Sequence, residues 1–469
     1  MTDPADLTLV ELLPLLEDRR LSARELLEAC LARVERDEAR VQAFVVLTPE
    51  LARTAAERAD ADRAAGRPTG PLAGVPVALK DLYLTAGVPT TASSRVLEGH
   101  DPGVDAAVWQ RLRDAGAGLL GKTTLHEFAY GTGSAPTRNP WDPSRTPGGS
   151  SGGSGAALAA RMVPVATGSD TGGSLRIPAA ACGVSSLRPT QGRVSTYGAL
   201  PLSRSLDTTG PMARRMLDVS LLLGLLAGHD PRDPGSLDEP VPDYPGASPE
   251  DLTGARIGVA GRWFWDDVDA SVAATCRSAL ERLVVRGAEL VPFDPPDRTE
   301  ELMAFPGTYG AIMGPEALEH HAAWLAEREH LYGAAVLHRL EQARDITPAQ
   351  HARARLDREH WREQWRALFA AHSLDAVAHP TLPEPPPVQP VEGRGTGASL
   401  RTTRAWSVNG FPALSVPAGL DVRGLPVGLE LACLPEQEAR LVGLGIAVDE
   451  DVQLWRRAPE NPLDAGGTV

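Results

Sequence analysis

Residues 168–184 read GSDTGGSLRIPAAACGV, and the serine in this stretch, Ser174, directly follows two glycines. Glycine permits backbone angles that other residues avoid, so Gly172 and Gly173 favour a tight turn. In such a turn the backbone N–H groups of Thr171, Gly172, Gly173 and Ser174 could converge on one point. Converging donors form an oxyanion hole, which stabilises the tetrahedral intermediate of acyl transfer. Gly-Gly-Ser is common in loops, so the stretch needs support from the rest of the chain.

A second glycine-rich stretch, residues 116–123, reads GAGLLGKT and matches the phosphate-binding pattern G-x-x-x-x-G-K-[ST]. That loop must connect a strand to a helix, so that backbone N–H groups face the phosphates. Here an amphipathic helix over 106–116 precedes the loop, and the apolar pair 119–120 indicates a strand inside it. We therefore expect a helix cap followed by a strand, with Lys122 in a structural contact. A nucleotide site is the minor alternative.

A third stretch, residues 148–152, reads GGSSG and matches the G-x-S-x-G elbow of α/β-hydrolases. The elbow needs a strand that runs into the serine. The preceding residues, WDPSRTP, contain two prolines, and proline is a poor strand residue. We therefore expect no Ser-His-Asp elbow at Ser150. The whole region 140–210 is rich in Gly, Ser, Thr and Pro, which predicts loops.

Lysine is scarce in this chain. Of the 46 Lys and Arg residues only two are lysine, Lys80 in GVPVALKDLYL (residues 74–84) and Lys122. An arginine-rich composition has a simple explanation in coding bias. The two exceptions therefore indicate positions where arginine would not serve.

The composition excludes several classes of function. The chain has 469 residues and a net charge of −15, which argues against a nucleic-acid surface. The most apolar run, residues 219–228, is too short to span a bilayer, and the N-terminus does not resemble a signal peptide. The cysteines are far apart and show neither CxxC nor zinc spacing, so we expect reduced thiols and a cytoplasmic protein. They are Cys30, Cys182, Cys276 and Cys433.

Alternating patterns predict an α/β architecture. Two S/T-x-x-E capping boxes, at Thr8 and Ser22, begin leucine-rich helices near the N-terminus. Farther along, strands are predicted over 255–261 and 288–293, with a helix over about 270–286 between them. The charged segment 350–372 predicts a long helix in a solvated outer layer.

Taken in order, the glycine-rich stretches and Lys80 resemble the amidase signature family. The resemblance is dense over about 70–230 and sparser beyond, where SVNGFPALSVPAGLDVRGLPVGLEL (407–431) extends it. It rests on PLAGVPVALKD (71–81), GLLGKTTLHEFAYG (118–131), TRNPWDPSRTPGGSSGGSGAALAA (137–160), VPVATGSDTGGSLRIPAAACGV (163–184) and LRPTQGRVSTYGALPLSRSLDTTGPMAR (187–214). The resemblance implies one amidase domain over 1–469 built on a large twisted mixed β-sheet with helices on both faces. Its parts are a helical segment (1–69), the signature core (70–230), a connector (231–253) and a variable α/β part (254–469).

The resemblance also assigns catalytic residues. Enzymes of this family use a Ser–cis-Ser–Lys triad, which here implies Ser174 as nucleophile, Ser150 as bridging serine 24 positions earlier, and Lys80 as base. The peptide bond between Gly149 and Ser150 would be cis. A lysine can act as base only if its pKa falls by about three units, and arginine cannot act as base at all.

The remaining residues of the active centre would have supporting roles. The resemblance places the oxyanion donors at the N–H groups of Thr171 to Ser174. It gives Gly149, Asp170 and Arg176 structural roles around the nucleophile. It implies no metal, nucleotide or organic cofactor.

The substrate is a small-molecule amide in the favoured interpretation. The family also contains the A subunit of the glutamyl-tRNA(Gln) amidotransferase, a glutaminase. We favour a stand-alone amidase because KDL replaces the usual KDN after Lys80, and because GRWFW (261–265) is similar to carboxybiuret and mandelamide hydrolases. A homodimer stays open, and no membrane partner is expected. The substrate pocket is predicted to involve Phe128, Ala129, Tyr130, Gly131, Thr132, Tyr309 and Trp406, with His320 and His321 as weaker candidates.

Overall fold

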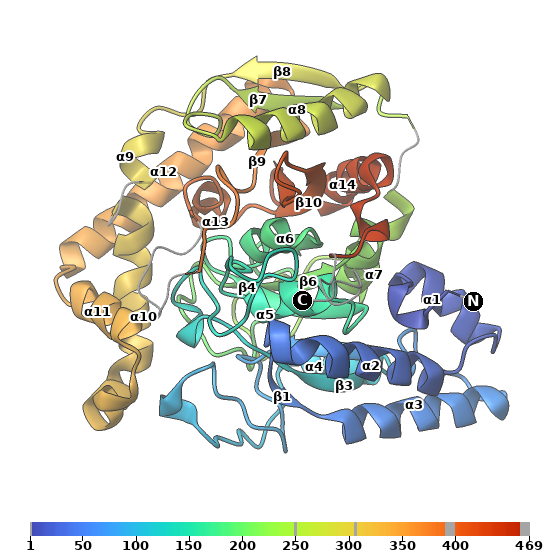
Figure 1. Ribbon diagram of the computed structural model, residues 1–469. Coiled ribbons are helices and arrows are strands. Elements are labelled where there is room, and N and C mark those ends of the chain that lie inside the picture. Colours follow the sequence, from blue (N-terminus) through green and yellow to red (C-terminus); the bar gives the residue numbers. More distant parts are fainter. Residues whose placement is uncertain (1, 248–250, 304–306, 390–398, 460–469) are drawn as a thin grey trace, which may run out of the picture.

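One mixed sheet organises the molecule (Figure 1). The computed structural model describes residues 2–247, 251–303, 307–389 and 399–459. Within them, eleven strands follow the order β1-β3-β2-β4-β6-β5-β10-β11-β9-β7-β8. The strands are β1 (Phe44–Leu47), β2 (Pro76–Lys80), β3 (Gly118–Thr123), β4 (Val165–Asp170), β5 (Ser185–Arg188), β6 (Thr208–Ala213), β7 (Arg256–Ala260), β8 (Glu289–Phe293), β9 (Ala376–Pro380), β10 (Ala413–Leu420) and β11 (Pro426–Ala432).

The pairing of the strands confirms the predicted α/β class with a mixed sheet. β2 runs parallel to β3 and β4, and β7 runs parallel to β8 and β9. The remaining pairs are antiparallel. Strands from both halves of the chain therefore share one sheet, because β5 pairs with β10.

Helices pack on both faces of the sheet. In a strand, successive side chains point to opposite faces. On β10, Leu414 contacts Gly445 of α14, whereas Ser415 lies beside Gly428, where Ala180 of α6 also packs. The helices are α1 (Leu9–Glu17), α2 (Ala23–Val41), α3 (Pro49–Ala64), α4 (Ala107–Asp114), α5 (Gly152–Ala159), α6 (Arg176–Cys182), α7 (Met216–Leu226), α8 (Ala270–Val285), α9 (Thr299–Met303), α10 (Gly307–Arg328), α11 (Ala334–Ala343), α12 (Pro348–His372), α13 (Arg404–Asn409) and α14 (Glu438–Val452).

The N-terminal helices begin where the sequence predicts. The Glu11 carboxylate accepts a hydrogen bond from the Thr8 N–H at 2.8 Å, and Glu25 does the same for Ser22. A buried carboxylate of α7, Asp218, also accepts hydrogen bonds from the first two N–H groups of α1, each at 3.0 Å. These contacts satisfy N–H groups that the helix itself leaves unpaired. They also tie the N-terminal segment to the core.

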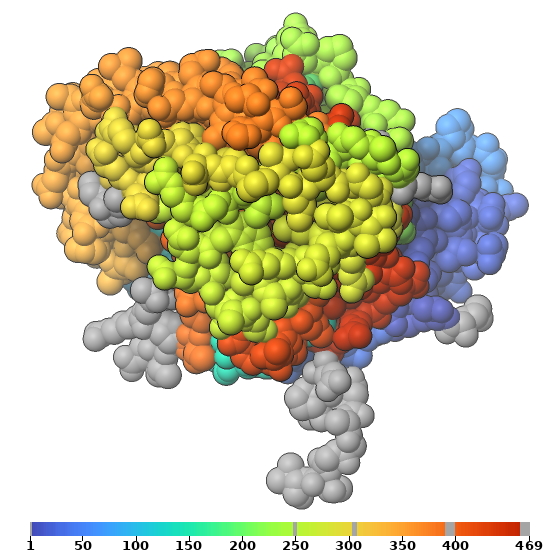
Figure 2. All heavy atoms as spheres, turned by 90° about the horizontal axis from the view of Figure 1, so that it is seen from above, coloured from blue at the N-terminus to red at the C-terminus, as the bar shows by residue number. Residues whose placement is uncertain are grey.

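Helices α10, α11 and α12 form a group along one side of the molecule (Figure 1). Seen from above, this side (orange) lies opposite the N-terminal residues (blue, Figure 2). The predicted long helix over 350–372 is α12, but it is more than a solvated outer layer. Its indole side chains Trp361 and Trp365 are fully buried, and Trp365 packs against Trp406 at 4.7 Å between ring centroids.

The region 140–210 differs from the loop prediction. It contains α5, β4, α6 and β5 and the start of β6. Small residues allow close packing there as well as turns. A Cβ atom added at Gly155 of α5 would press on the backbone of α6. A Cβ atom added at Gly210 of β6 would overlap the carbonyl of Leu187. The glycine content of this region therefore reflects tightly packed helices and strands as well as loops.

The two other glycine-rich motifs adopt the predicted context. Residues 118–123 of the apparent phosphate loop form β3, a central strand between β1 and β2. Ser150 lies just before α5, and no strand lies in residues 130–151, so a hydrolase elbow is absent there. The sheet hydrogen bonds of β3 occupy the backbone groups that a phosphate would need.

Lys122 on β3 is fully buried and forms an ion pair with Asp81, 3.1 Å from its Oδ1. It also donates a hydrogen bond to the Thr90 hydroxyl at 2.9 Å. The second oxygen of Asp81 accepts hydrogen bonds from the N–H and hydroxyl of Thr91. This buried pair therefore connects the end of β2 with the end of β3 and with the loop at residues 90–91.

We predict that Lys122→Met lowers the free energy of unfolding by about 3–5 kcal/mol, because it leaves a buried carboxylate without its cation. The double variant Lys122→Met with Asp81→Asn should recover most of that loss, since no charge then remains. Urea denaturation followed by circular dichroism measures both. A matched control is Arg366→Met, whose exposed pair with Glu363 should contribute less than about 1 kcal/mol. A loss equally small for Lys122→Met would contradict the structural role.

Candidate active site

Lys80, the last residue of β2, is fully buried and surrounded by serine hydroxyls. Its Nζ lies 2.7 Å from Ser150 Oγ and 2.8 Å from the Oγ atoms of Ser151 and Ser169. Burial lowers the pKa of Lys80 to about 7, against the opposing attraction of Asp170 and Asp207. No carboxylate of the described residues forms an ion pair with it. An amine in this setting can be neutral near pH 7 and can accept a proton.

Ser174 lies on the predicted turn between β4 and α6. Gly173 has φ +135°, a conformation that side chains rarely adopt, and a Cβ there would overlap the Thr403 side chain. The Ser174 carbonyl accepts a hydrogen bond from the Ser151 N–H at 3.3 Å. The turn therefore lies directly against the segment that carries Ser150. The peptide bond between Gly149 and Ser150 is cis, as the resemblance implied.

Asp170 holds the turn through charge-assisted contacts. Its carboxylate accepts hydrogen bonds from the N–H groups of Gly173, at 2.9 Å, and Leu175, at 3.2 Å. It pairs with Arg176 at 3.0 Å and with Arg188 at 3.2 Å, all three side chains being fully buried. Burial alone would raise the pKa of Asp170, but the two guanidinium groups hold it well below its usual value. The carboxylate therefore stays ionised and connects the turn with α6 and β5.

The four predicted oxyanion donors are not equivalent. The Gly173 N–H is already bonded to Asp170. For the N–H groups of Thr171, Gly172 and Ser174 the described part of the chain offers no acceptor. A Cβ at Gly172 would overlap the Tyr309 hydroxyl, so this part of the turn is in close contact with α10. Of the four predicted donors, the amides of Thr171, Gly172 and Ser174 therefore have no acceptor within the described residues.

A cavity of about 180 Å³ opens at Ser174. Of the predicted pocket residues, Ala129, Tyr130, Gly131, Thr132 and Tyr309 line it. The other lining residues are Thr171, Gly172, Leu202, Met313, Arg339, Leu400 and Arg404. The volume suits a short acyl group better than a large one.

Two predicted pocket residues lie away from this cavity. Phe128 packs edge-on against His321, at 4.5 Å between ring centroids, and stacks on Trp324. Trp406 is fully buried, and its Nε1 donates a hydrogen bond to His379 at 2.8 Å. His321 is bonded to the Tyr332 hydroxyl, and neither it nor His320 lines the cavity.

Sequence reasoning missed four side chains of the site. Ser151 and Ser169 are direct partners of Lys80, although both occur in the quoted motifs. Arg339 and Arg404 line the cavity, and they come from α11 and the start of α13. Arginines are so frequent in this chain that no local signal distinguished these two.

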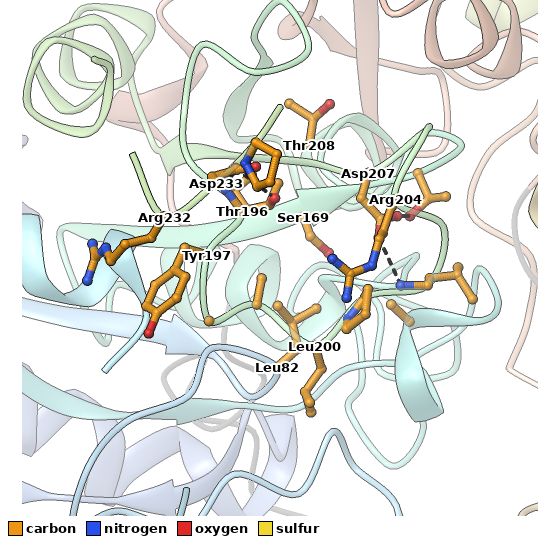
Figure 3. Close-up of a pocket in the computed structure, with 18 residues that line it drawn as sticks. Leu82, Ser169, Thr196, Tyr197, Leu200, Arg204, Asp207, Thr208, Arg232 and Asp233 are labelled. Atoms are coloured by element: carbon orange, nitrogen blue, oxygen red, sulfur yellow. Dashed lines mark hydrogen bonds between the residues drawn. The ribbon is translucent and has the colours of Figure 1, made fainter. Parts of the chain in front are cut away.

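A second cavity of about 340 Å³ lies beside the first and shares Ala129, Thr171 and Leu202 with it. Figure 3 shows Arg204 and Asp207 at one end of this cavity, Arg232 and Tyr197 at the other, and Ser169 between them. The Thr171 hydroxyl donates a hydrogen bond to Asp207 at 2.5 Å. Burial raises the pKa of Asp207 to about 6. Ser169, whose hydroxyl contacts Lys80, lines this second cavity, whereas Ser174 lines only the first.

The described residues hold no group of three or more His, Cys, Asp or Glu side chains arranged for a metal ion. No helix among them has the length and apolar character needed to cross a bilayer. All four cysteines are free and buried.

Comparisons with known proteins show the family of the chain. The family model for amidases matches residues 25–442. An amidase of Pseudomonas putida is 42% identical, covering 98% of this chain and 99% of that protein. The A subunit of the glutamyl-tRNA(Gln) amidotransferase of Chloroflexus aggregans is 39% identical over 94% of this chain and 95% of its own length. The structure of the peptide amidase from Stenotrophomonas maltophilia superposes with a TM-score of 0.84 at 32% identity, covering 97% of this chain and 98% of that one. The chain is an amide hydrolase and belongs to the amidase signature family.

Proposed function

We propose that this enzyme hydrolyses the C–N bond of a small-molecule amide, with Ser174 as nucleophile, Ser150 as proton carrier and Lys80 as base. The observation that carries the proposal is the contact between Lys80 Nζ and Ser150 Oγ at 2.7 Å. It joins a buried amine of lowered pKa to the segment that lies against the Ser174 turn. A base that is neutral near pH 7 activates a serine hydroxyl, which is otherwise a poor nucleophile.

The reaction is an acyl transfer in two halves. Neutral Lys80 accepts the Ser150 proton while Ser150 accepts the proton of Ser174, and Ser174 Oγ forms a bond to the amide carbon. The C–N bond then breaks, and the leaving amine takes the proton back through Ser150. Water then attacks the acyl carbon of the acyl-enzyme and gives its proton to Lys80 through Ser150. The carboxylic acid leaves, and Ser174 regains its proton.

The developing oxyanion would be stabilised by backbone amides. We assign this role to the N–H groups of Thr171, Gly172 and Ser174, because the Gly173 N–H is held by Asp170. A fixed donor of this kind lowers the activation barrier by about 3–4 kcal/mol in other acyl-transfer enzymes. Asp170 would act by holding the turn rather than by touching the substrate.

A glutaminase subunit of a tRNA-dependent amidotransferase is the second candidate, since subunits of that kind are 38–40% identical to this chain. The cavity favours the stand-alone amidase. No Asp or Glu is among its described lining residues, so the ammonium group of glutamine would find no counter-charge beside Ser174. The buried free thiols fit a reducing, cytoplasmic setting. A homodimer is compatible with this proposal.

We predict that a fluorophosphonate probe labels Ser174 and not Ser150. The probe needs an activated hydroxyl that faces the cavity, and Ser174 lines the cavity whereas Ser150 is fully buried. Digestion and mass spectrometry locate the adduct. The variant Ser174→Ala should abolish labelling. An adduct on Ser150 would overturn the assignment of the nucleophile.

Lys80 provides the sharpest test of the mechanism. Because the pKa of Lys80 is lowered to about 7, we expect kcat/KM to rise with pH as the amine loses its proton, with a midpoint near pH 7. Lys80→Arg should lower turnover at least about 1,000-fold from pH 6 to 10, because arginine cannot release its proton at these values. Circular dichroism should show that this variant remains folded. A folded Lys80→Arg enzyme with a tenth of the activity would show that Lys80 acts only as a cation.

A further inference from the structure

We infer that the substrate carries a carboxylate close to its amide group, and that Arg404 and Arg339 bind it. This inference rests on the proposed amidase function. Both guanidinium groups line the small cavity that contains Ser174. Neither forms an ion pair with any Asp or Glu in the part of the chain that the structure describes.

Arg404 is the less satisfied of the two. Its Nε is buried and has no hydrogen-bond partner within the described residues. Its guanidinium carbon lies 5.9 Å from the ring centroid of Tyr309, which is a neutral neighbour. Burial lowers the pKa of Arg404, which means that the surroundings do not compensate its charge. A buried cation without a counter-charge is unfavourable, so the site is completed by an anion.

Arg339 has only neutral partners among the described residues. It donates hydrogen bonds to the Tyr130 carbonyl and to His126 Nε2, the latter at 3.3 Å. Burial lowers the pKa of His126 to about 4, with Arg339 adding to the effect, so this imidazole is uncharged at neutral pH. Its Nδ1 faces the Gly133 carbonyl at 2.7 Å and is therefore the protonated nitrogen, which leaves Nε2 as acceptor. The positive charge of Arg339 thus remains uncompensated.

The buried arginines just beneath the turn behave differently. Arg176 and Arg188 both pair with Asp170, and Arg176 also pairs with Glu430. Other buried arginines of the described chain, such as Arg214 and Arg358, also lack an ion pair, but they donate to backbone carbonyls away from the cavity. Arg339 and Arg404 differ from them because both line the cavity that contains Ser174, where an anionic ligand can supply the missing charge.

Arg404 is also held at a fixed place relative to the nucleophile. Its neighbour Thr403 donates a hydrogen bond to the Gly172 carbonyl at 2.6 Å, and the Thr403 carbonyl accepts one from Arg176 at 2.9 Å. Arg404 is the first residue of α13, where the helix dipole disfavours a cation. The position is therefore poor for stability but well suited to present a guanidinium fork beside the turn.

The cavity restricts the class of substrate further. A volume of about 180 Å³ suits a short chain between amide and carboxylate better than a long one. The absence of acidic side chains from the described lining disfavours a second, cationic group. The structure therefore points to monoamides of short dicarboxylic acids, such as succinamate or glutaramate. Glutamine, which adds an ammonium group to glutaramate, should be the poorer substrate.

The test compares amides that differ only in the carboxylate: succinamate with butanamide, and glutaramate with pentanamide. Ammonia release should give kcat/KM values at least about 30-fold higher for each anion, the usual effect of a charge-assisted contact on binding. Glutaramate should also exceed L-glutamine. Equal values for the anionic and neutral amides would overturn the inference while leaving the amidase function intact.

Variants then locate the anion site. Arg404→Met should raise KM for glutaramate at least about 10-fold, change pentanamide hydrolysis less than about 3-fold, and be partly rescued in Arg404→Lys. Arg204→Met is the matched control, because Arg204 lines only the larger cavity. An equal loss for both substrates in Arg404→Met would indicate a structural role and contradict the inference.

A binding measurement separates this inference from the proposed function. Calorimetry with glutarate on Ser174→Ala needs no turnover, and binding that disappears in Ser174→Ala with Arg404→Met would support the anion site even if no amide in the panel were hydrolysed. Failure of fluorophosphonate labelling would instead count against the proposed function alone. Absence of glutarate binding to Ser174→Ala would overturn the anion site.

Discussion

The carboxylate of Asp170 is the contact on which the reactive centre depends. It ends β4, accepts two backbone N–H groups of the following turn, and pairs with guanidinium groups from α6 and β5. The Ser407 hydroxyl on α13 also donates to it, at 3.1 Å. Residues 170–188 and the distant helix α13 thus converge on one buried anion. Removing that anion would leave two buried cations without their partner, a cost of several kcal/mol, and would free the Gly173 amide from its present orientation.

The two lysines show how the surroundings decide the role of one residue type. Both are fully buried, and burial lowers the pKa of each. Lys122 contacts a carboxylate, which favours its charged form and makes it half of an ion pair. Lys80 contacts three hydroxyls, which solvate an amine without favouring the cation to the same degree. Adjacent strands of one sheet therefore hold a structural cation and a candidate base, and in the strand register Lys122 lies opposite Leu79, the neighbour of Lys80.

Sequence patterns predicted the parts of the molecule that depend on local interactions or on long motifs. Capping boxes located α1 and α2, alternating patterns located β7, α8 and β8, and the match to the amidase signature placed Ser174 against the Ser150 segment. The donor role of Gly173 could not be judged, because it depends on which way the Asp170 carboxylate points. Arg339 and Arg404 come from helices that meet only in the folded chain, so no spacing in the sequence relates them. Trp406 and Phe128 were placed in the pocket, but in the structure Trp406 bonds to His379, Phe128 packs against His321, and neither lines the cavity.

The burial of Lys80 and Lys122 also has a chemical consequence for the intact protein. These are the only two lysines in the chain, and neither exposes its side chain to solvent. The folded protein therefore presents no lysine amine to acylating reagents, to cross-linkers directed at amines, or to enzymes that modify lysine. Reaction at either lysine becomes a direct measure of opening of the β2–β3 region, the same part of the sheet that carries the candidate base.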